Sequence, residues 1–455
     1  MSHTSAHHRH GHPRHVPPVA SHFDTTVPAL VLKMGYLPLH HGGLGVIRSL
    51  GRVGVPVYGI HEDRFTPAAM SRYLRGRFLW VPERTDAEEL LDGMSTIGER
   101  FEGPPIVIPT DDISAIVLAE HADFLGRWFR FPRQDAGLAR RLADKRELYQ
   151  LCGGLGVPCP EAIFPASWEE ARDFARSTGF PVVVKIPQLW LVPKAARVKS
   201  STIVPTLDEL ADLYHRLGDQ AASNLILQEH IPTGEDWFFH GYCDASSATL
   251  AGFTGVKVRS YPAYAGPTTL GRWVSNDELR EQAEWLFKAV AYRGIMDMDY
   301  RLDLRDGRYK LLDFNPRVGA QFRLFEDDAG IDVVRAMHLD LTGRDVPRGR
   351  PIEGRAFMVE TGDLLSTRGY RHAGALTWRS WLRSLLGVRE LAWLARDDLL
   401  PLLAVCFRFA LRAFERPLGI ERTGRRAYAA PRFVRDRRSS DGLRRLAALA
   451  GRRGT

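Results

Sequence analysis

Two acidic residues that lie close together in the sequence could bind a metal ion. Asp299 and Asp313 belong to the stretch 294–319, GIMDMDYRLDLRDGRYKLLDFNPRVG, in which polar and apolar residues alternate as in a half-buried β-strand. The intervening Arg305-Asp306-Gly307 is typical of a three-residue hairpin loop with Gly at the position of positive φ. In the resulting register Asp299 faces Asp313 across the hairpin, and Asn315 lies on the same face.

The loop length decides whether these acids can act together. A three-residue loop pairs Leu304 with Arg308, whereas a two-residue Asp-Gly loop would put Asp299 and Asp313 on opposite faces. Two facing carboxylates repel each other unless a cation lies between them. A few oxygen ligands suit a Mg²⁺ ion that also binds phosphates. The alternative is a solvated acidic face on an ordinary hairpin, and the hairpin alone does not decide between the two.

The composition is that of a globular protein with room for three or more structural units. The four cysteines lack metal-binding spacing and no secretory signal is evident, so we expect free thiols and a cytoplasmic location. The formal net charge of +8 resides in residues 415–455, which hold twelve Arg and four acids. The remainder is neutral, which argues against a specific nucleic-acid groove.

Lysine is rare in this chain, which uses Arg for most of its positive charges. A retained Lys indicates a place where a compact charge on a flexible stem is useful, although chance retention explains any single one equally well. Of the 62 basic residues, eight are Lys: Lys33, Lys145, Lys185, Lys194, Lys199, Lys257, Lys288 and Lys310.

The first part of the chain reads as a leader followed by an α/β domain. Residues 1–27 hold seven of the sixteen His, and we predict a disordered leader. Strand and helix patterns alternate over residues 28–132, as in an open, doubly wound sheet. Gly42, Gly43 and Gly45 open the first helix, but they lack the full GxGxxG spacing and no acid ends the next strand. We interpret them as a tight turn rather than a dinucleotide site.

Taken in order, the motifs that follow resemble the ATP-grasp superfamily of carboxylate–amine ligases. The resemblance covers about residues 28–344 and implies a pre-ATP-grasp α/β domain followed by a two-lobed ATP-grasp fold over residues 133–345. The motifs are Lys145 in LADKREL, Lys185 in PVVVKIP, Gln228-Glu229-His230-Ile231 with Glu235 and Asp236, and Asp299 with Asp313-Phe314-Asn315-Pro316-Arg317.

The resemblance implies a nucleotide site for ATP. Lys145 and Lys185 would bind the α- and β-phosphates. The segment 228–231 would hold the adenine edge, and either Glu235 or Asp236 would bind the ribose hydroxyls.

The resemblance also implies a metal site and an activity. Asp299, Asp313 and Asn315 would hold two Mg²⁺ ions that bridge the phosphates, and Arg317 would steady the acyl phosphate or the transferred phosphoryl group. Many relatives have Arg two residues before the first metal acid; this chain has Asp297 there, which either widens the metal site or is solvated. The expected reaction joins a small-molecule carboxylate to an amine and releases ADP and phosphate.

One departure from the family pattern leaves a second function open. Members often have a Gly-rich lid after the second lysine strand, whereas residues 188–204 contain no Gly. The lid would then depend on Lys194, Lys199 and Ser200-Ser201. The alternative is a catalytically silent nucleotide-binding protein with a regulatory or scaffolding role.

The family pattern fades after residue 345. Residues 346–415 predict a closing strand and a helical extension rich in Leu, Trp and Arg, and residues 416–455 form an Arg-rich tail. The longest apolar run of the extension, residues 399–407, is too short to cross a bilayer. Two interpretations stay open: helices that lie on an anionic membrane, or a surface that packs within the chain or in a homodimer.

Overall fold

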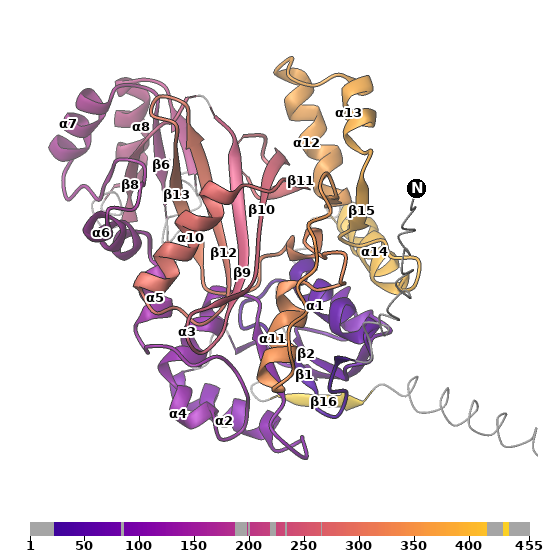
Figure 1. The fold of residues 1–455 in the computed structure, drawn as a ribbon. Coiled ribbons are helices and arrows are strands. Elements are labelled where there is room, and N and C mark those ends of the chain that lie inside the picture. Colours follow the sequence, from indigo (N-terminus) through magenta and orange to yellow (C-terminus); the bar gives the residue numbers. More distant parts are fainter. Residues whose placement is uncertain are drawn as a thin grey trace, which may run out of the picture.

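The computed structural model describes residues 22–82, 86–186, 198, 201–218, 224–232, 234–264, 266–415 and 431–435. These residues form three β-sheets with helices packed on them (Figure 1). The mixed α/β architecture confirms the predicted fold class. The proposed lid residues Lys194, Lys199 and Ser200, and residues 1–21 of the leader, lie outside the described part of the chain.

The N-terminal sheet is an open α/β sheet with strand order β16-β3-β2-β1-β4. Strands β1 to β4 of this sheet are parallel to one another. They are β1 (Ala29–Leu32), β2 (Val57–His61), β3 (Leu74–Leu79) and β4 (Ile106–Pro109). Helix α1 (His41–Arg52) packs on one face, and the helices on the other face are α2 (Ala87–Gly98), α3 (Asp112–Glu120) and α4 (Ala122–Leu125).

The predicted bounds of the N-terminal α/β domain need correction, because the leader and the Arg-rich tail each add residues to it. Phe23, assigned to the disordered leader, is buried in the core beneath α1, so the folded chain begins before residue 28. In the tail, β16 (Arg432–Arg435) pairs antiparallel with β3 and covers the edge of the sheet. Part of the Arg-rich tail is therefore an edge strand, while residues 416–430 and 436–455 lie outside the described part.

The glycines at the start of α1 permit close packing onto the chain that follows the acidic hairpin. A Cβ atom on Gly42 would lie 3.0 Å from Cα of Ala320, and one on Gly45 would lie 3.0 Å from Cε1 of Phe322. Side chains larger than hydrogen would push α1 away from this segment. The prediction of a tight turn is wrong, because these glycines lie within α1. Their close approach to residues 320–322 joins the N-terminal sheet to the end of the hairpin.

A small four-stranded sheet forms the first lobe of the central region, with order β5-β8-β6-β7. Its strands are β5 (Ala162–Ile163), β6 (Val182–Lys185), β7 (Ser201–Val204) and β8 (Ile226–Glu229). Helices α7 (Trp168–Thr178) and α8 (Leu207–Leu217) form the core of this lobe with the sheet. Helices α5 (Leu138–Ala143) and α6 (Lys145–Leu155) precede it and pack on the larger sheet.

The larger sheet has seven strands in the order β13-β12-β9-β10-β11-β14-β15. Its central strands are β9 (Asp236–Cys243), β10 (Thr249–Ser260), β11 (Thr268–Trp273), β12 (Gly294–Asp303) and β13 (Arg308–Asn315). Helix α10 (Asp277–Ala289) covers the apolar face of β12 and β13 (Figure 1). Helix α11 (Val333–Leu341) follows the hairpin and packs with α1 in the core of the N-terminal sheet.

The acidic hairpin has the predicted facing pair but a different loop. Asp299 pairs with Asp313, as expected. The pairing of Leu304 with Arg308 is wrong: Arg308 pairs with Asp303, and residues 304–307 form a four-residue loop. This loop would shift the register by one, but an irregularity between Asp299 and Tyr300 leaves one extra residue on β13 and restores the facing carboxylates.

The C-terminal extension is part of the folded body. β14 (Ala356–Met358) pairs with β11, and β15 (Val388–Leu391) pairs with β14, so both extend the larger sheet. The helices are α12 (Glu360–His372), α13 (Trp378–Ser384) and α14 (Leu400–Glu415). Among the described residues, no helix combines the length and the apolar character that crossing a membrane requires.

Candidate active site

The facing acids lie on the side of the larger sheet opposite to α10. Alternation along β12 and β13 turns Met298, Tyr300 and Phe314 toward α10, where they are buried, and turns Asp299 and Asp313 away from it. Burial raises the pKa of Asp299 even though nearby Lys257 favours the charged form. The pair therefore brings two carboxylates together at a site where nearby cations are stabilising.

Three lysines from three different elements surround this pair. Lys145 begins α6 and forms an ion pair with Asp313. Lys257 on β10 has its Nζ atom 3.8 Å from Oδ1 of Asp299. Lys185 ends β6 of the small sheet, as its position after an apolar strand predicted. The hairpin and two predicted lysines are thus brought together between the two sheets.

The pKa values of the three lysines are shifted by burial and by neighbouring charges, and these shifts suit an anionic ligand. Burial lowers the pKa of Lys145 to about 8. Burial and the neighbouring charge of Lys145 lower the pKa of Lys185 well below its usual value. Burial also disfavours charged Lys257, but the attraction of Asp299 outweighs it and raises the pKa. A polyanion placed here would stabilise all three ammonium groups.

Lys257 was not predicted as a site residue. It lies on a strand without any motif, and only the rarity of lysine in this chain could have singled it out. Two of the three lysines around the acids were predicted from motifs, and the third was among the eight retained lysines.

Arg317 connects the hairpin to the N-terminal sheet. Its Nη1 donates to Oδ2 of Asp297 at 2.8 Å, and its Nε lies 3.2 Å from Oδ1 of Asp112, which begins α3. Burial disfavours the guanidinium charge, but both carboxylates outweigh this and raise the pKa of Arg317. Asp112 was not predicted because its partner lies 205 positions later in the sequence.

Asp297 is neither solvated nor free to widen a metal site. It is 4% exposed and is neutralised by Arg317. Nε2 of the buried His240 also lies 3.2 Å from Oδ1 of Asp297. Burial lowers the pKa of His240, although the charge of Asp297 opposes the shift. The expectation that Asp297 is solvated is wrong.

Asn315 lies beside Asp297 in the register, and its amide Nδ2 donates to the Asp297 carbonyl oxygen at 3.1 Å. This bond holds the side chain at the end of the acidic face. Within the described ranges, no group of three or more His, Cys, Asp or Glu could by itself hold a metal ion. Two carboxylates and an amide fit Mg²⁺, because this ion takes few protein ligands and keeps places for phosphate oxygens.

The predicted adenine segment lies at the end of β8. The Glu229 carboxylate is turned toward the hairpin loop: Arg305 Nη2 donates to it at 2.5 Å and Lys310 Nζ at 3.1 Å. The Glu161 amide N also donates to the Glu229 carboxylate, at 3.0 Å. Desolvation opposes the charged form of Glu229, but these bonds outweigh it and lower the pKa. The described contacts of Glu229 therefore hold the small sheet to the hairpin.

The other residues predicted to bind the nucleotide lie near the start of β9. The Ile231 carbonyl oxygen accepts from Arg301 Nε at 3.1 Å, and Arg301 also pairs with Asp236 at 2.7 Å. Glu235 is exposed, and His230 is half-buried. Of the two candidate ribose ligands, the Asp236 carboxylate is therefore occupied by Arg301, whereas Glu235 faces solvent.

Tyr149 on α6 bridges the two lobes beside the site. Its hydroxyl lies 3.2 Å from Oε1 of Gln228 on β8 and 3.3 Å from the Leu312 carbonyl oxygen on β13. Leu312 is the extra residue at the irregularity in the hairpin. One helix thus positions Lys145 and fixes the lobes that carry the acids and the second lysine.

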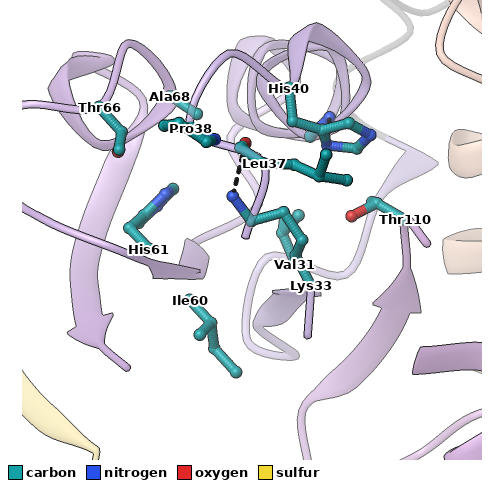
Figure 2. A pocket seen from close by; sticks show the side chains of 11 residues that line it. Val31, Lys33, Leu37, Pro38, His40, Ile60, His61, Thr66, Ala68 and Thr110 are labelled. Atoms are coloured by element: carbon teal, nitrogen blue, oxygen red, sulfur yellow. Dashed lines mark hydrogen bonds between the residues drawn. The ribbon is translucent and has the colours of Figure 1, made fainter. Parts of the chain in front are cut away.

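A small pocket lies at the carboxyl ends of β1 and β2 in the N-terminal sheet (Figure 2). Lys33 dominates it, but its Nζ pairs with Glu62 at 2.7 Å and donates to the Leu37 carbonyl oxygen at 2.9 Å. The cavity has about 10 Å³, the space of one water molecule. It is too small for a dinucleotide, which agrees with the interpretation of the glycines as a packing feature.

Comparison with known proteins supports the resemblance. No family model matches the chain. D-aspartate ligase of Enterococcus faecium is 25% identical over 232 residues, which are 47% of this chain and 53% of the relative. The chain thus spans about half the length of that curated relative. The carbamoyl phosphate synthase large chain of Thermomicrobium roseum is 23% identical over 273 residues, 57% of this chain and 24% of the relative.

Solved structures agree on the fold. N5-carboxyaminoimidazole synthetase from Staphylococcus aureus, complexed with ADP, superposes with a TM-score of 0.56 at 13% identity and covers 76% of this chain and 86% of that chain. The biotin carboxylase domain of Hydrogenobacter thermophilus 2-oxoglutarate carboxylase, in complex with MgADP and bicarbonate, gives 0.52 at 16% identity and covers 71% of each.

The chain has the ATP-grasp fold. The predicted ATP-grasp fold is confirmed. The small sheet is then the first ATP-grasp lobe, and the larger sheet carries the acidic hairpin of the second. In this ATP-grasp chain, the lysines and acids brought together between the lobes are the predicted ones, with Lys257 added.

Proposed function

We propose that this ATP-grasp protein is an ATP- and Mg²⁺-dependent ligase that joins a small-molecule carboxylate to an amine. The observation that carries the proposal is the convergence of Lys145, Lys185 and Lys257 on the facing acids Asp299 and Asp313. Such a site attracts both a polyphosphate and the cation that accompanies it. The similarity to the named ligases supports the same activity.

The proposed reaction needs two steps. A carboxylate oxygen attacks the γ-phosphorus of ATP, the bond from that phosphorus to the β-phosphate oxygen breaks, and ADP leaves. The amine nitrogen then attacks the acyl carbon, the carbon–oxygen bond to phosphate breaks, and the nitrogen loses a proton. Both steps build negative charge on oxygen atoms, so they need fixed positive charge away from water.

The side chains can be assigned to these needs. Lys145 and Lys185 would hold the α- and β-phosphates, and Lys257, beside Asp299, would offset charge on the transferred phosphoryl group. Arg317, held by Asp297 and Asp112, would steady the acyl phosphate. Mg²⁺ on Asp299, Asp313 and Asn315 would offset the phosphate charge.

Fewer side chains are free to contact adenine and ribose than the family pattern implies. The adenine edge would lie against segment 228–231, mainly against its main chain, since the Glu229 side chain is bonded to the hairpin. Glu235 is exposed and would bind the ribose hydroxyls in preference to Asp236, which pairs with Arg301.

The test is ADP and phosphate release from ATP over a panel of carboxylates and amines. We expect release only when both substrates and Mg²⁺ are present, and loss of at least about a hundredfold in Asp313→Asn and Lys185→Ala. Unchanged release by both folded variants would contradict the assignment. Tight nucleotide binding without turnover over the whole panel would favour the silent regulatory or scaffolding protein instead.

We also propose a cytoplasmic location and peripheral contact of the C-terminal extension with a membrane. The four cysteines are all free, as a reducing compartment requires. The extension exposes large apolar side chains, among them Leu382 and Leu386, which are 60% and 72% exposed. The alternative is that a second copy of the chain covers the same surface in a homodimer.

A further inference from the structure

Helix α12 of the α12–α13 helical hairpin buries small polar and acidic residues and exposes leucines. On α12 the buried residues are Asp363, Ser366 and Thr367. Leu364 and Leu365 of the same helix are 62% and 53% exposed. Helices of globular proteins normally show the opposite arrangement. The outer face of this hairpin therefore suits something outside the chain.

Helix α13 continues the exposed apolar face. None of its residues is buried. Trp378 and Leu382, four positions apart and so on one side of the helix, are 53% and 60% exposed, and Leu386 just beyond it is 72% exposed. In Figure 1 the two helices lie side by side and project away from the N-terminal sheet. The face is accessible to a flat partner.

Buried polar contacts fix the hairpin in this orientation. Arg259 of β10 forms an ion pair with Asp363 at 2.7 Å and donates to Oγ of Ser384 at 2.7 Å. Nε1 of Trp381 donates to the same Asp363 carboxylate at 2.9 Å. These bonds hold α12 and α13 to the sheet and to each other by their polar sides. The outward direction of the leucines is thus built into the fold.

The charges of the hairpin select the partner. Between residues 364 and 389 there is no Asp, Glu or Lys, and every Arg is exposed. The two acids that border this segment are already paired: Asp363 with Arg259, and Glu390 with Arg52 and Arg323. A second copy on this face would bring like charges together, which is unfavourable. The exposed arginines are Arg368, Arg371, Arg379, Arg383 and Arg389.

We propose that α12 and α13 dock the protein on the surface of an anionic lipid bilayer. Leu and Trp would enter the interface between head groups and acyl chains, and the arginines would bind lipid phosphates. This inference rests on the proposed peripheral membrane contact and assigns it to one element. Because Lys257 lies two residues before Arg259 on β10, the docked hairpin would hold the active site near the bilayer.

Co-sedimentation of the full chain with vesicles tests the assignment. We expect binding to phosphatidylcholine vesicles that contain phosphatidylglycerol, weak binding to pure phosphatidylcholine, and release by salt. Arg379→Gln with Arg383→Gln should weaken binding about thirtyfold, because each basic residue near the surface contributes roughly fivefold. Leu382→Ser with Leu386→Ser should abolish it. All four side chains are exposed, so the fold should persist, as circular dichroism would verify.

The matched control is Leu403→Ser with Phe407→Ser on α14, which removes equally exposed apolar side chains and should leave vesicle binding within about twofold. If only this control loses binding, membrane contact stands but the hairpin assignment is overturned. Full binding by both hairpin variants also overturns it. A dimer that the hairpin variants abolish, without vesicle binding by the parent, would show a second copy as the partner. ADP release, measured on the same samples, tests the ligase separately.

Discussion

The lysines of the site differ in how easily they lose their charge. Lys145 has a pKa of about 8 because it is buried, and the nearby acids only partly offset that burial. Phosphate oxygens at this position would hold Lys145 in its charged form. Nucleotide binding would therefore take up a proton above pH 8, and affinity would fall as the pH rises through this value.

This predicts that ADP binds about tenfold more weakly at about pH 9 than at about pH 7, since the charged fraction of Lys145 falls by that factor. Titration calorimetry in buffers of different ionisation enthalpy would measure both the affinity and the proton uptake. Lys145→Arg keeps its charge over this range and should remove most of the dependence. An equal dependence in this variant would assign the effect to another group.

Lys257 is the site residue that the sequence did not reveal. We predict that Lys257→Ala lowers the rate of ADP release at least about tenfold, because one positive charge beside the reacting phosphoryl group is lost. The matched control is Lys288→Ala on α10, whose side chain is 58% exposed. Equal rates for the two variants would remove Lys257 from the mechanism.

At the scale of single residues, the sequence predicted those site residues that belong to a short motif. Lys145, Lys185 and the facing acids were predicted from short motifs with definite spacing. Lys257 and Asp112 act through partners far away in the sequence, and nothing in their neighbours indicates those partners. The burial of Asp297 was missed for the same reason, since Arg317 and His240 neutralise and cover it only in the folded chain.

At the scale of elements, the acidic β-hairpin of β12 and β13 shows which structural features a sequence pattern can predict. Alternation identified the faces correctly along β12, and on β13 from Asp313 onward, because a strand places every second side chain on one side. Leu312 was predicted on the apolar face, but Leu311 and Tyr309 are the residues buried there. The loop length was wrong, yet Asp299 and Asp313 still face each other. The irregularity at Leu312 compensates for the extra loop residue, and no periodic pattern contains that information.

Helix α6 should matter for stability through a single hydroxyl group. Tyr149→Phe removes the contacts with Gln228 and Leu312, and we predict a loss of about 1 kcal/mol in the free energy of unfolding. Urea unfolding would measure it. Tyr264→Phe is the control, because Tyr264 is 53% exposed. No difference between the two variants would show that the bridge contributes nothing.

At the scale of the whole molecule, the C-terminal extension is held to the N-terminal sheet by buried charge. Nε of Arg48 on α1 lies 3.1 Å from Oδ2 of Asp398, and both side chains are almost fully buried. Arg48 also donates to the carbonyl oxygens of Ala392 and Trp393. The sequence left open whether the extension packs within the chain, and these bonds show that its residues 392–398 do.

Asp398→Asn would leave the Arg48 guanidinium buried without its anion. We predict a loss of about 3 kcal/mol in the free energy of unfolding, measured by urea denaturation. Asp123→Asn, which removes an exposed partner of Arg133, is the control and should cause no measurable change. A similar small effect for both variants would mean that the extension is held by other contacts.

The central claim is that the facing carboxylates hold Mg²⁺ for a bound nucleotide. The most direct measurement is the affinity for ADP with and without Mg²⁺, by calorimetry, in the parent chain and in Asp299→Asn and Asp313→Asn. We predict that Mg²⁺ strengthens binding at least about tenfold in the parent, and that each variant loses this gain while it remains folded. Undiminished Mg²⁺ dependence in both variants would contradict the account.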